Sequence, residues 1–493
     1  MDKNTKKYYN LNDIPEKIKK EVDKMVKNSP FKQKFHIEAP SGYLNDPNGF
    51  SFFNGECHLF YQWTPYMYSS ENVWYQGWYH LKGTDFLTWE KLGAGIEADE
   101  KFATHGAYSG SAIADDDKLT IFYTGNTRNE DWQRIPYQVI ATMDKNNIIT
   151  KRENPEITGT LDGYTDHFRD PKIWKNFDGE YYAIIGIQRK NLTGTAVIAH
   201  SKDTYNWQIL GEIDTNLKNF GYMWECPDYF QLKDEKTGKI VNILAACPQG
   251  LKAEGDLYNN KYQSGYFFGK LNYEKSDFEI TSEFTELDRG HDFYAPQTME
   301  DDKGRRILVG WMGVPEEEDY PTVKKEWLHC LTLPRELKVI NGVLYQLPIE
   351  EMQRIRGEKT EFNGRVNGEI ETGKGTAYEM IAEFSDFSDD FGLKLRTGEN
   401  SETVIKFDYR EKKLILDRSR GEQPDKKPRK VYLGDIEKLD LRIFVDNSSV
   451  EVFVNSGKEV FSSRIFPQKN ADGIKVFSEG NVNVKIEKWE WQD

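Results

Sequence analysis

Three acidic residues stand in short motifs that could share one chemistry: Asp46 in NDPNG, Asp170 in FRDPK and Glu225 in WECPD. A single aspartate before a proline is usually a turn residue. Here, two Asp-Pro pairs recur at matching places, each proline eight residues before a turn glycine, and the glutamate precedes a comparable strand. Clustered carboxylates repel, so one tends to keep its proton while another stays ionised. Glycoside hydrolysis requires this division of labour, with an acid for the leaving oxygen and a carboxylate that attacks or stabilises the sugar cation.

Other chemistries have weaker support in the same motifs. Oxygen-rich sites suit Ca²⁺ or Mg²⁺, but the sequence has no DxDxDG-type loop and its eight histidines lack HExxH spacing, so we expect no metal. The run Ser109-Gly110-Ser111 does not follow the GxSxG pattern of a serine nucleophile. Cys226, beside Glu225, is most simply a packed thiol. No phosphate loop or dinucleotide fingerprint is present, so we expect no cofactor.

The residues around the carboxylates favour a sugar ligand. Aromatic, amide and hydroxyl side chains gather near the ends of the expected strands: Phe60, Tyr61, Gln62, Trp63, Trp74, Trp78, Tyr108, Ser109, Trp224, Tyr294 and Trp311. Such a mixture suits a ligand with apolar C–H faces and a polar rim. Any single ring is more simply explained by core packing, and the concentration of rings is the signal. Arg169 is equally compatible with a hydroxyl contact and with a structural ion pair.

The elements that must position these residues repeat along the chain. A turn followed by a buried strand recurs at Gly55, Lys118, Gly179, Gly238 and Gly304, at intervals of 63, 61, 59 and 66 residues, and another strand-like run precedes each turn. About 60 residues hold four strands and their loops, which is one propeller blade. The repeat predicts an all-β fold with a five-bladed β-propeller over residues 32–347, with two stacked sandwiches as the alternative. Its inner strands would bring the three carboxylates to one mouth.

The two ends of the chain have a different character. Residues 1–31 are expected to form a helical extension, with an apolar face on a helix over 13–27 that docks on the main domain or binds a partner. Residues 348–359 would form a linker. Residues 360–493 alternate with period two, which predicts a C-terminal β-sandwich. A structural role for this sandwich is favoured over that of a carbohydrate-binding module.

Composition limits the partners. The 493 residues include 81 acidic and 66 basic side chains, so the net charge is −15. Nucleic acid and anionic membranes require a basic surface, so neither is expected as a partner. No apolar run approaches a membrane span, no secretory signal is visible, and the four cysteines lack disulfide or zinc spacing. These features predict a reduced, cytoplasmic protein whose oligomeric state stays open.

At these motifs the sequence resembles glycoside hydrolase family 32, the β-fructofuranosidases. NDPNG (45–49), FYQ (60–62), YSGS (108–111), FYTGN (122–126), FRDP (168–171) and WECPD (224–228) stand in the family's order and spacing. The resemblance implies a five-bladed propeller followed by a β-sandwich, with Asp46 as nucleophile, Asp170 as transition-state stabiliser and Glu225 as general acid/base. It also implies a fructose pocket lined by Tyr43, Leu44, Asn45, Gln62, Trp78, Tyr108, Ser109, Arg169 and Trp311.

Within the family, the bacterial sucrose-6-phosphate hydrolases are the most similar branch, through HDFYAPQT (291–298) and EWLHCLTLPREL (326–337). The implied reaction is hydrolysis of sucrose 6-phosphate, and of sucrose, with retention and release of fructose. Two alternatives stay open: an invertase or fructan hydrolase acting on unphosphorylated substrate, and a non-catalytic sugar-binding propeller. A phosphate would need basic residues, and five lie in loops of suitable units: Arg128, Arg134, Arg189, Lys252 and Lys261. The segment Trp78-Tyr79-His80 departs from the family's Trp-Gly-His, on the leaving-group side.

Overall fold

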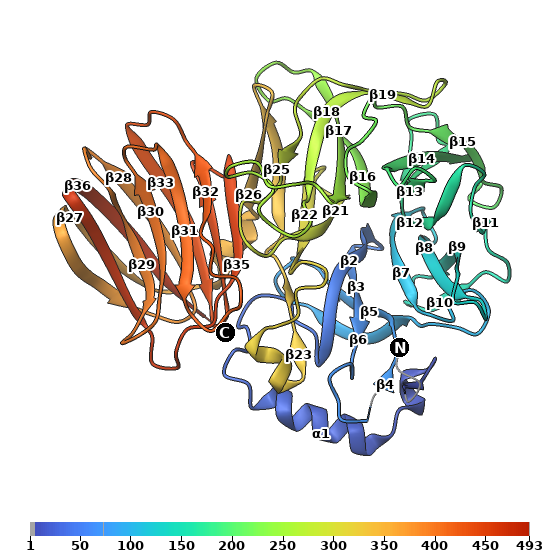
Figure 1. Ribbon diagram of the computed structural model, residues 1–493, viewed down its shortest axis with the longest axis horizontal. Coiled ribbons are helices and arrows are strands. Elements are labelled where there is room, and N and C mark those ends of the chain that lie inside the picture. The colour runs from blue at the N-terminus through green and yellow to red at the C-terminus, as the bar shows by residue number, and fades with distance from the viewer. Residues whose placement is uncertain (1–4, 72, 493) are drawn as a thin grey trace.

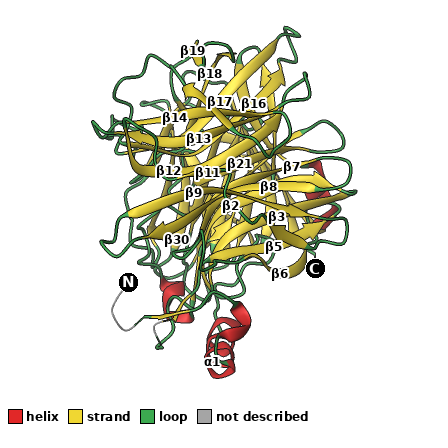
Figure 2. Ribbon diagram, turned by 90° about the vertical axis from the view of Figure 1, so that its right-hand side faces the viewer, coloured by secondary structure: helices red, strands yellow, loops and turns green. Residues whose placement is uncertain are grey.

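The computed structural model describes residues 5–71 and 73–492. Residues 1–4 of the expected extension and residue 493 of the expected sandwich lie outside the described residues. The expected fold class is confirmed, because a five-bladed β-propeller is followed by a C-terminal β-sandwich (Figure 1). Nearly all regular structure is strand (Figure 2). Within the described ranges, no helix has the length and apolar character needed to cross a membrane.

Each blade has four main antiparallel strands, and four of the five blades have a short additional strand. Blade 1 contains β2 (Gly42–Phe53), β3 (Glu56–Thr64), β5 (Gly77–Gly83) and β6 (Glu90–Ile96). Blade 2 contains β7 (Ala107–Ala114), β8 (Leu119–Arg128), β9 (Arg134–Met143), β10 (Ile149–Lys151) and β11 (Ile157–Thr158). Blade 3 contains β12 (Tyr164–Lys175), β13 (Tyr181–Arg189), β14 (Gly194–Ser201) and β15 (Gln208–Glu212).

The last two blades complete the ring. Blade 4 contains β16 (Met223–Lys233), β17 (Ile240–Gln249), β18 (Gly265–Asn272), β19 (Asp277–Ile280) and β20 (Thr285–Glu286). Blade 5 contains β21 (Tyr294–Glu300), β22 (Arg306–Met312), β24 (Cys330–Leu331), β25 (Arg335–Ile340) and β26 (Val343–Pro348). From the loop between β22 and β24, β23 (Trp327–Leu328) pairs in parallel with the start of β2, which ties the last blade to the first.

The five inner strands, β2, β7, β12, β16 and β21, share one irregularity. In each, two residues are skipped in the pairing with the next strand: 45–46, 108–109, 170–171, 226–227 and 295–296. Such a bulge removes residues from the ladder and re-aims their side chains. Three of the bulges contain a proline, which has no N–H to give to a ladder. The fivefold repeat of this bulge therefore directs residues of all five inner strands away from regular pairing at one level of the propeller.

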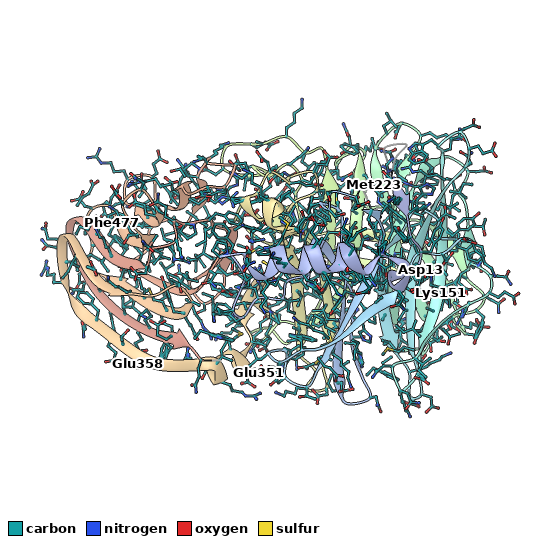
Figure 3. The ribbon with its side chains drawn as sticks, turned by 90° about the horizontal axis from the view of Figure 1, so that it is seen from below. Asp13, Lys151, Met223, Glu351, Glu358 and Phe477 are labelled. Atoms are coloured by element: carbon teal, nitrogen blue, oxygen red, sulfur yellow. The ribbon has the colours of Figure 1, made fainter. Side chains whose placement is uncertain are left out.

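Helical segments are few and lie at the edges of the propeller. The helix α1 (Glu16–Lys27) runs along its lower side (Figures 1 and 3). Its apolar face buries Ile18, Val22 and Val26 against the core of blade 1, which confirms the expected docked amphipathic helix. The other short elements are β1 (Lys6–Lys7), paired with β4 (Val73–Trp74), and three 3₁₀ turns, η1 (Leu11–Asp13), η2 (Pro321–Lys325) and η3 (Glu350–Ile355).

The C-terminal sandwich is built around two long strands. Its strands are β27 (Arg356–Lys374), β28 (Tyr378–Ser385), β29 (Phe391–Thr397), β30 (Glu402–Asp408), β31 (Lys413–Arg420), β32 (Arg429–Tyr432), β33 (Lys438–Asp446), β34 (Ser449–Val454), β35 (Glu459–Arg464) and β36 (Gly473–Trp491). The first part of β36 pairs with β29 and its second part with β28, while β27 pairs along both parts. The two layers therefore share β27 and β36 and enclose one apolar core.

Buried ion pairs join the sandwich to the propeller. Arg335 of blade 5 bonds Glu451 of β34 at 2.7 Å and lies 3.1 Å from Asp288. His36, ahead of blade 1, lies 3.0 Å from both Asp446 and Glu451. All five side chains are fully buried. Removal of one member of such a network leaves an unpaired buried charge, so the two parts are held at a fixed position.

Candidate active site

Asp46 and Asp170 lie in the bulges of their inner strands and Glu225 lies directly before the bulge of β16, so the three meet at one end of the central channel. They line a shared cavity of about 220 Å³. Cys226 lies between them, with its backbone N–H donating to Asp170 Oδ2 at 3.1 Å and its Sγ 3.6 Å from Asp46 Oδ2. Asp46 is the second skipped residue of its bulge and Asp170 the first of its own. Three carboxylates from β2, β12 and β16 thus face the same small volume.

A chain of hydrogen bonds orients Asp46. The Ser109 hydroxyl donates to Asp46 Oδ2 at 2.5 Å, and Gln62 Nε2 donates to that hydroxyl at 2.8 Å. The side-chain amides of Asn45 and Gln76 in turn donate to Gln62 Oε1, at 2.7 and 3.2 Å. Ser109 donates its hydroxyl hydrogen bond to the carboxylate and therefore positions Asp46.

Glu225 is held from both sides. Its Oε1 accepts hydrogen bonds from Arg169 Nε at 3.2 Å and Nη2 at 2.7 Å. Its Oε2 accepts from Gln249 Nε2 at 2.7 Å and from the Tyr294 hydroxyl at 2.8 Å. All of these donors stabilise a carboxylate. Arg169 therefore forms an ion pair in the ligand-free site, one of the two roles that its position suggested.

Asp170 adopts a backbone conformation that L-residues rarely take, with φ of +67°. Its backbone N–H donates to Thr124 Oγ1 at 3.0 Å, and its carboxylate lies 3.9 Å from Arg169 Nε. Non-glycine residues in the left-handed region cost free energy and persist where the surroundings fix them. Here the bulge, Thr124 and the Cys226 N–H fix both the backbone and the carboxylate.

Burial sets the titration of the site. Desolvation, with a smaller contribution from the charge of Glu225, raises the pKa of Asp46 to about 6, although the Ser109 hydrogen bond opposes the rise. Desolvation raises the pKa of Asp170 to about 7, against the attraction of Arg169 and with the repulsion of Glu225 and Asp46. These carboxyls share one small volume, so the cluster retains protons close to neutral pH.

Most of the expected sugar-binding residues line the cavity. They are Tyr43, Asn45, Gln62, Tyr108, Arg169 and Trp311. The Trp311 ring lies 5.9 Å from the Tyr43 ring and 6.2 Å from the Tyr294 ring, centre to centre. Together these aromatic faces form a wall beside the carboxylates. Ser109 lies behind Asp46 and acts through it.

The position of two expected pocket residues differs from the prediction. Leu44 is fully buried in the core of blade 1, because it is still paired with Trp63 and its side chain points to the opposite side of the strand from Asn45. Trp78 is also fully buried, packed between blades 1 and 2, and its Nε1 donates to the Tyr108 carbonyl oxygen at 3.1 Å. Both residues support the pocket from behind and do not line it.

Sequence reasoning missed several residues that contact the site. Gln76 and Pro315 line the cavity, and Gln249 bonds Glu225. Tyr294 and Arg134 were noted only as an aromatic residue and as a basic loop residue, and both also line the cavity. All five lie away from the Asp-Pro and Glu-Cys motifs: Gln76 and Pro315 in loops, Gln249 at the end of β17, Arg134 at the start of β9 and Tyr294 at the start of β21. Among residues 5–71 and 73–492, no group of three His, Cys, Asp or Glu side chains is arranged to hold a metal ion.

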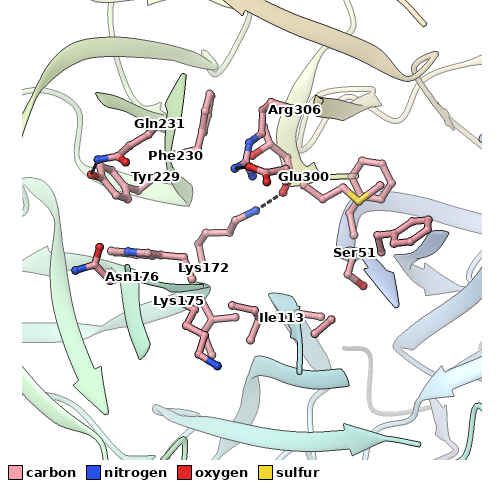
Figure 4. Close-up of a pocket in the computed structure, with 18 of the residues that line it drawn as sticks. Ser51, Ile113, Lys172, Lys175, Asn176, Tyr229, Phe230, Gln231, Glu300 and Arg306 are labelled. Carbon is pink, nitrogen blue, oxygen red and sulfur yellow. Dashed lines mark hydrogen bonds and ion pairs between the residues drawn. The ribbon is translucent and has the colours of Figure 1, made fainter. Parts of the chain in front are cut away.

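A second hollow, of about 460 Å³, lies at the opposite ends of the inner strands (Figure 4). Its lining includes Lys172, Lys175 and Arg306, and each of these cations is paired with a carboxylate at 3.1 to 3.3 Å. None of the three carboxylates of the first cavity lines it. This hollow is larger, yet the convergent titratable groups are in the smaller one.

A five-bladed propeller with three carboxylates at one mouth of its channel, followed by a β-sandwich, is the architecture of a class of glycosidases. The sequence matches "Glycosyl hydrolases family 32 N-terminal domain" over residues 36–348 and "Glycosyl hydrolases family 32 C terminal" over residues 351–490. The chain belongs to glycoside hydrolase family 32.

Similar proteins cover almost the whole chain. It is 39% identical to the sucrose-6-phosphate hydrolase of Staphylococcus xylosus, over 98% of this chain and 97% of the relative, and 36% identical to that of Bacillus subtilis, over 95% and 96%. Among solved structures, a sucrose-6-phosphate hydrolase from Lactobacillus gasseri is 33% identical with a TM-score of 0.89, covering 98% of both chains. A Bombyx mori β-fructofuranosidase variant in complex with sucrose is 32% identical with a TM-score of 0.81, covering 97% of both chains.

Proposed function

We propose that this protein is a retaining β-fructofuranosidase that hydrolyses sucrose 6-phosphate, and sucrose, to release fructose. The observation that carries the proposal is the convergence of Asp46, Asp170 and Glu225, from three blades, on one cavity walled by aromatic rings and amides. The names of the relatives support the substrate. A substrate that already carries phosphate implies an enzyme in the cytoplasm, because a charged sugar phosphate does not diffuse across a membrane.

In this proposal, Asp46 attacks the fructosyl anomeric carbon and Glu225 protonates the departing glycosidic oxygen, then deprotonates the water that frees the fructosyl enzyme. Asp170, held beside Arg169, accepts hydrogen bonds from fructosyl hydroxyls and stabilises the cationic transition state. Ser109 and Gln62 keep Asp46 oriented for attack. No metal or cofactor has a part in these steps.

The proton needed for the leaving group is already present in the carboxylate cluster. The raised pKa values of Asp46 and Asp170 mean that the ligand-free site holds a proton near neutrality. Closely coupled groups share their protons. The proposal requires this proton to be on Glu225 when the glycosidic oxygen is bound, as Arg169 turns from Glu225 to the substrate hydroxyls.

We also propose a division of the chain into a helical extension (1–31), a catalytic propeller (32–347), a linker (348–359), within which β27 of the sandwich begins at Arg356, and a sandwich (360–493). The sandwich has a structural role, which its buried ion pairs with the propeller support. The test uses the variant in which both Asp46 and Glu225 are replaced, with fructose added to fill the propeller pocket. If this variant still binds fructo-oligosaccharide, the sandwich is a carbohydrate-binding module.

The decisive experiment measures fructose release from sucrose and from sucrose 6-phosphate by wild type, Asp46→Asn and Glu225→Gln. We expect both variants to fold and to lose activity by orders of magnitude. With methanol as acceptor, the wild type should yield methyl β-fructofuranoside, the product of retention. A strong preference for free sucrose would identify an invertase, while sugar binding without fructose release would identify a non-catalytic propeller.

A further inference from the structure

We propose that Arg134, at the start of β9 in blade 2, binds the phosphate group of the substrate on the leaving-group side of the pocket. This inference rests on the proposed function and extends it, because it assigns the recognition of a phosphate monoester to one side chain. Of the five basic residues that the sequence left as candidates, Arg134 is the one that lines the cavity with Asp46, Asp170 and Glu225.

The charge of Arg134 has no counter-charge in the part of the chain that the structure describes. It forms no ion pair with any described carboxylate, and its Nε is buried without a hydrogen-bond partner. The nearby Asp166 uses its Oδ2 to accept the backbone N–H of Arg134, at 3.1 Å. The guanidinium lies 5.8 Å from the centre of the Tyr108 ring, and its Nη1 lies 3.2 Å from His167 Nδ1. Burial of an unpaired charge costs free energy, and an anionic ligand would offset that cost.

A second arginine stands directly across the hairpin. Arg128 is the cross-strand partner of Arg134 in the pairing of β8 with β9. Its Nη1 donates to the Trp132 carbonyl oxygen at 2.8 Å, and no described carboxylate pairs with it. Like charges directly opposite on two strands are destabilising. Burial, together with the charges of Arg169 and Arg128, lowers the pKa of Arg134. In a protein with a net charge of −15, such a local excess of positive charge is what an anion-binding site requires.

The other candidates are occupied or remote. Arg189 donates three hydrogen bonds of 2.5 to 3.0 Å to Glu212, and Lys261 pairs with Glu316 at 2.5 Å. Lys252 is exposed and does not line the cavity. Around the opposite hollow, the three lining cations already have carboxylate partners.

The position of Arg134 agrees with the direction of the leaving group. His167 Nδ1 lies 2.8 Å from Arg169 Nη1 as well as 3.2 Å from Arg134 Nη1, and Arg169 bonds Glu225. Arg134 is therefore separated by two side chains from the group proposed to protonate the glycosidic oxygen. A guanidinium at this place can meet a phosphate on the departing sugar, with the two-pronged geometry that suits phosphate oxygens.

The test compares kcat/KM for sucrose 6-phosphate and for sucrose in wild type, Arg134→Gln and Arg134→Lys. We expect Arg134→Gln to lose about 10- to 100-fold with sucrose 6-phosphate, the loss of a hydrogen-bonded charge, and to lose clearly less with sucrose, so that the preference for the phosphorylated sugar falls. Arg134→Lys should recover part of the loss, because lysine keeps the positive charge but lacks the two parallel N–H donors of the guanidinium. The matched control, Lys252→Gln, should leave both rates unchanged.

A second measurement uses inorganic phosphate as a probe. Phosphate should inhibit sucrose hydrolysis by the wild type competitively, and Arg134→Gln should be at least 10-fold less sensitive. Equal losses on both sugars, or an unchanged preference with unchanged phosphate inhibition, would overturn the inference and leave the β-fructofuranosidase proposal standing. If the wild type cleaves neither sugar, the proposed function is wrong. In that case calorimetry still tests the phosphate site: inorganic phosphate should bind to the wild type and not to Arg134→Gln.

Discussion

Replacement of Asp46 by asparagine should abolish activity and make the protein more stable. Burial raises the pKa of Asp46 to about 6, whereas an unfolded aspartate titrates near 3.8. Above pH 6 the folded protein therefore carries an ionised carboxylate in a place that disfavours it. At about 1.4 kcal/mol for each pKa unit, the difference corresponds to about 3 kcal/mol of lost stability. Asparagine has a similar shape and no charge, and it can still accept the Ser109 hydrogen bond, more weakly.

The sign of the pH dependence follows from the proton count. Between about pH 4 and pH 6 the folded wild type holds a proton on Asp46 that the unfolded chain has released, so wild-type stability falls as pH rises through this window. Asp46→Asn has no such proton. The stability difference should be small at pH 4, grow up to pH 6 and then stay constant at about 3 kcal/mol, because the pKa of about 6 already includes the Ser109 hydrogen bond. For 493 residues that unfold together, 3 kcal/mol corresponds to about 3 °C in Tm.

The assay is urea unfolding followed by tryptophan fluorescence, at pH 4.5 and pH 7.5, for wild type and Asp46→Asn. Asp203→Asn serves as the control with the opposite sign. Hydrogen bonds from the backbone N–H groups of Asn206 and Tyr205 lower the pKa of Asp203 to about 2, so its replacement should destabilise the protein at pH 7.5. If Asp46→Asn is no more stable than wild type at pH 7.5, or if the difference does not change with pH, the desolvation argument is wrong.

Three further outcomes follow from the same contacts. With sucrose as substrate, which has no titrating phosphate, kcat/KM should fall as pH drops below about 6 to 7, because the proposed nucleophile, Asp46, would have to be ionised to attack. An acid limb near pH 4 would contradict the burial of Asp46. Ser109→Ala removes the donor at 2.5 Å and should move that limb upward, with a larger loss at pH 6 than at pH 8, whereas an equal loss at both would indicate a merely structural role. Burial alone would lower the pKa of His36, but Asp446 and Glu451 raise it to about 9. The stabilisation that protonated His36 gives the folded protein is therefore complete below pH 6.5 and is lost as pH rises through 9. His36→Gln should be destabilised at pH 6.5 and approach wild type at pH 9.5, as measured by urea unfolding at both pH values.

The sequence predicted the propeller because the repeat in the sequence reflects local structural features that recur from blade to blade. The Pro-to-Gly register of Pro47, Pro171 and Pro296 marks a bulge and a hairpin turn in three inner strands, and both are local features. The same register predicted equivalent positions for Asp46 and Asp170 in their inner strands. In the structure the two differ by one residue within the bulge. The five bulges themselves were not predicted, because a skipped residue depends on the pairing with the neighbouring strand and not on the residue type alone.

The errors in the pocket have the same origin. Leu44 and Trp78 belong to motifs that surround the site in sequence, but alternation along a strand sends neighbouring side chains to opposite faces. Leu44 thus enters the core while Asn45 faces the cavity. Gln76 and Pro315 line the cavity from loops, and Gln249 bonds Glu225 from the end of β17. No pattern in the sequence distinguishes these residues from solvated ones.

The balance of charge is the part of the site that only the structure could give. The sequence contains 66 basic residues, and their number does not tell which of them lack a partner. In the folded chain Arg169 is paired with Glu225. Arg134 is connected to Arg169 through His167 and has no described counter-charge. The pocket therefore has an acidic floor, where buried carboxyls keep protons for the cleavage, and a basic wall in blade 2. A sugar with one anionic end satisfies both, with the neutral fructosyl ring against the carboxylates and the charged group against Arg134. Neutral sucrose would leave the guanidinium unpaired.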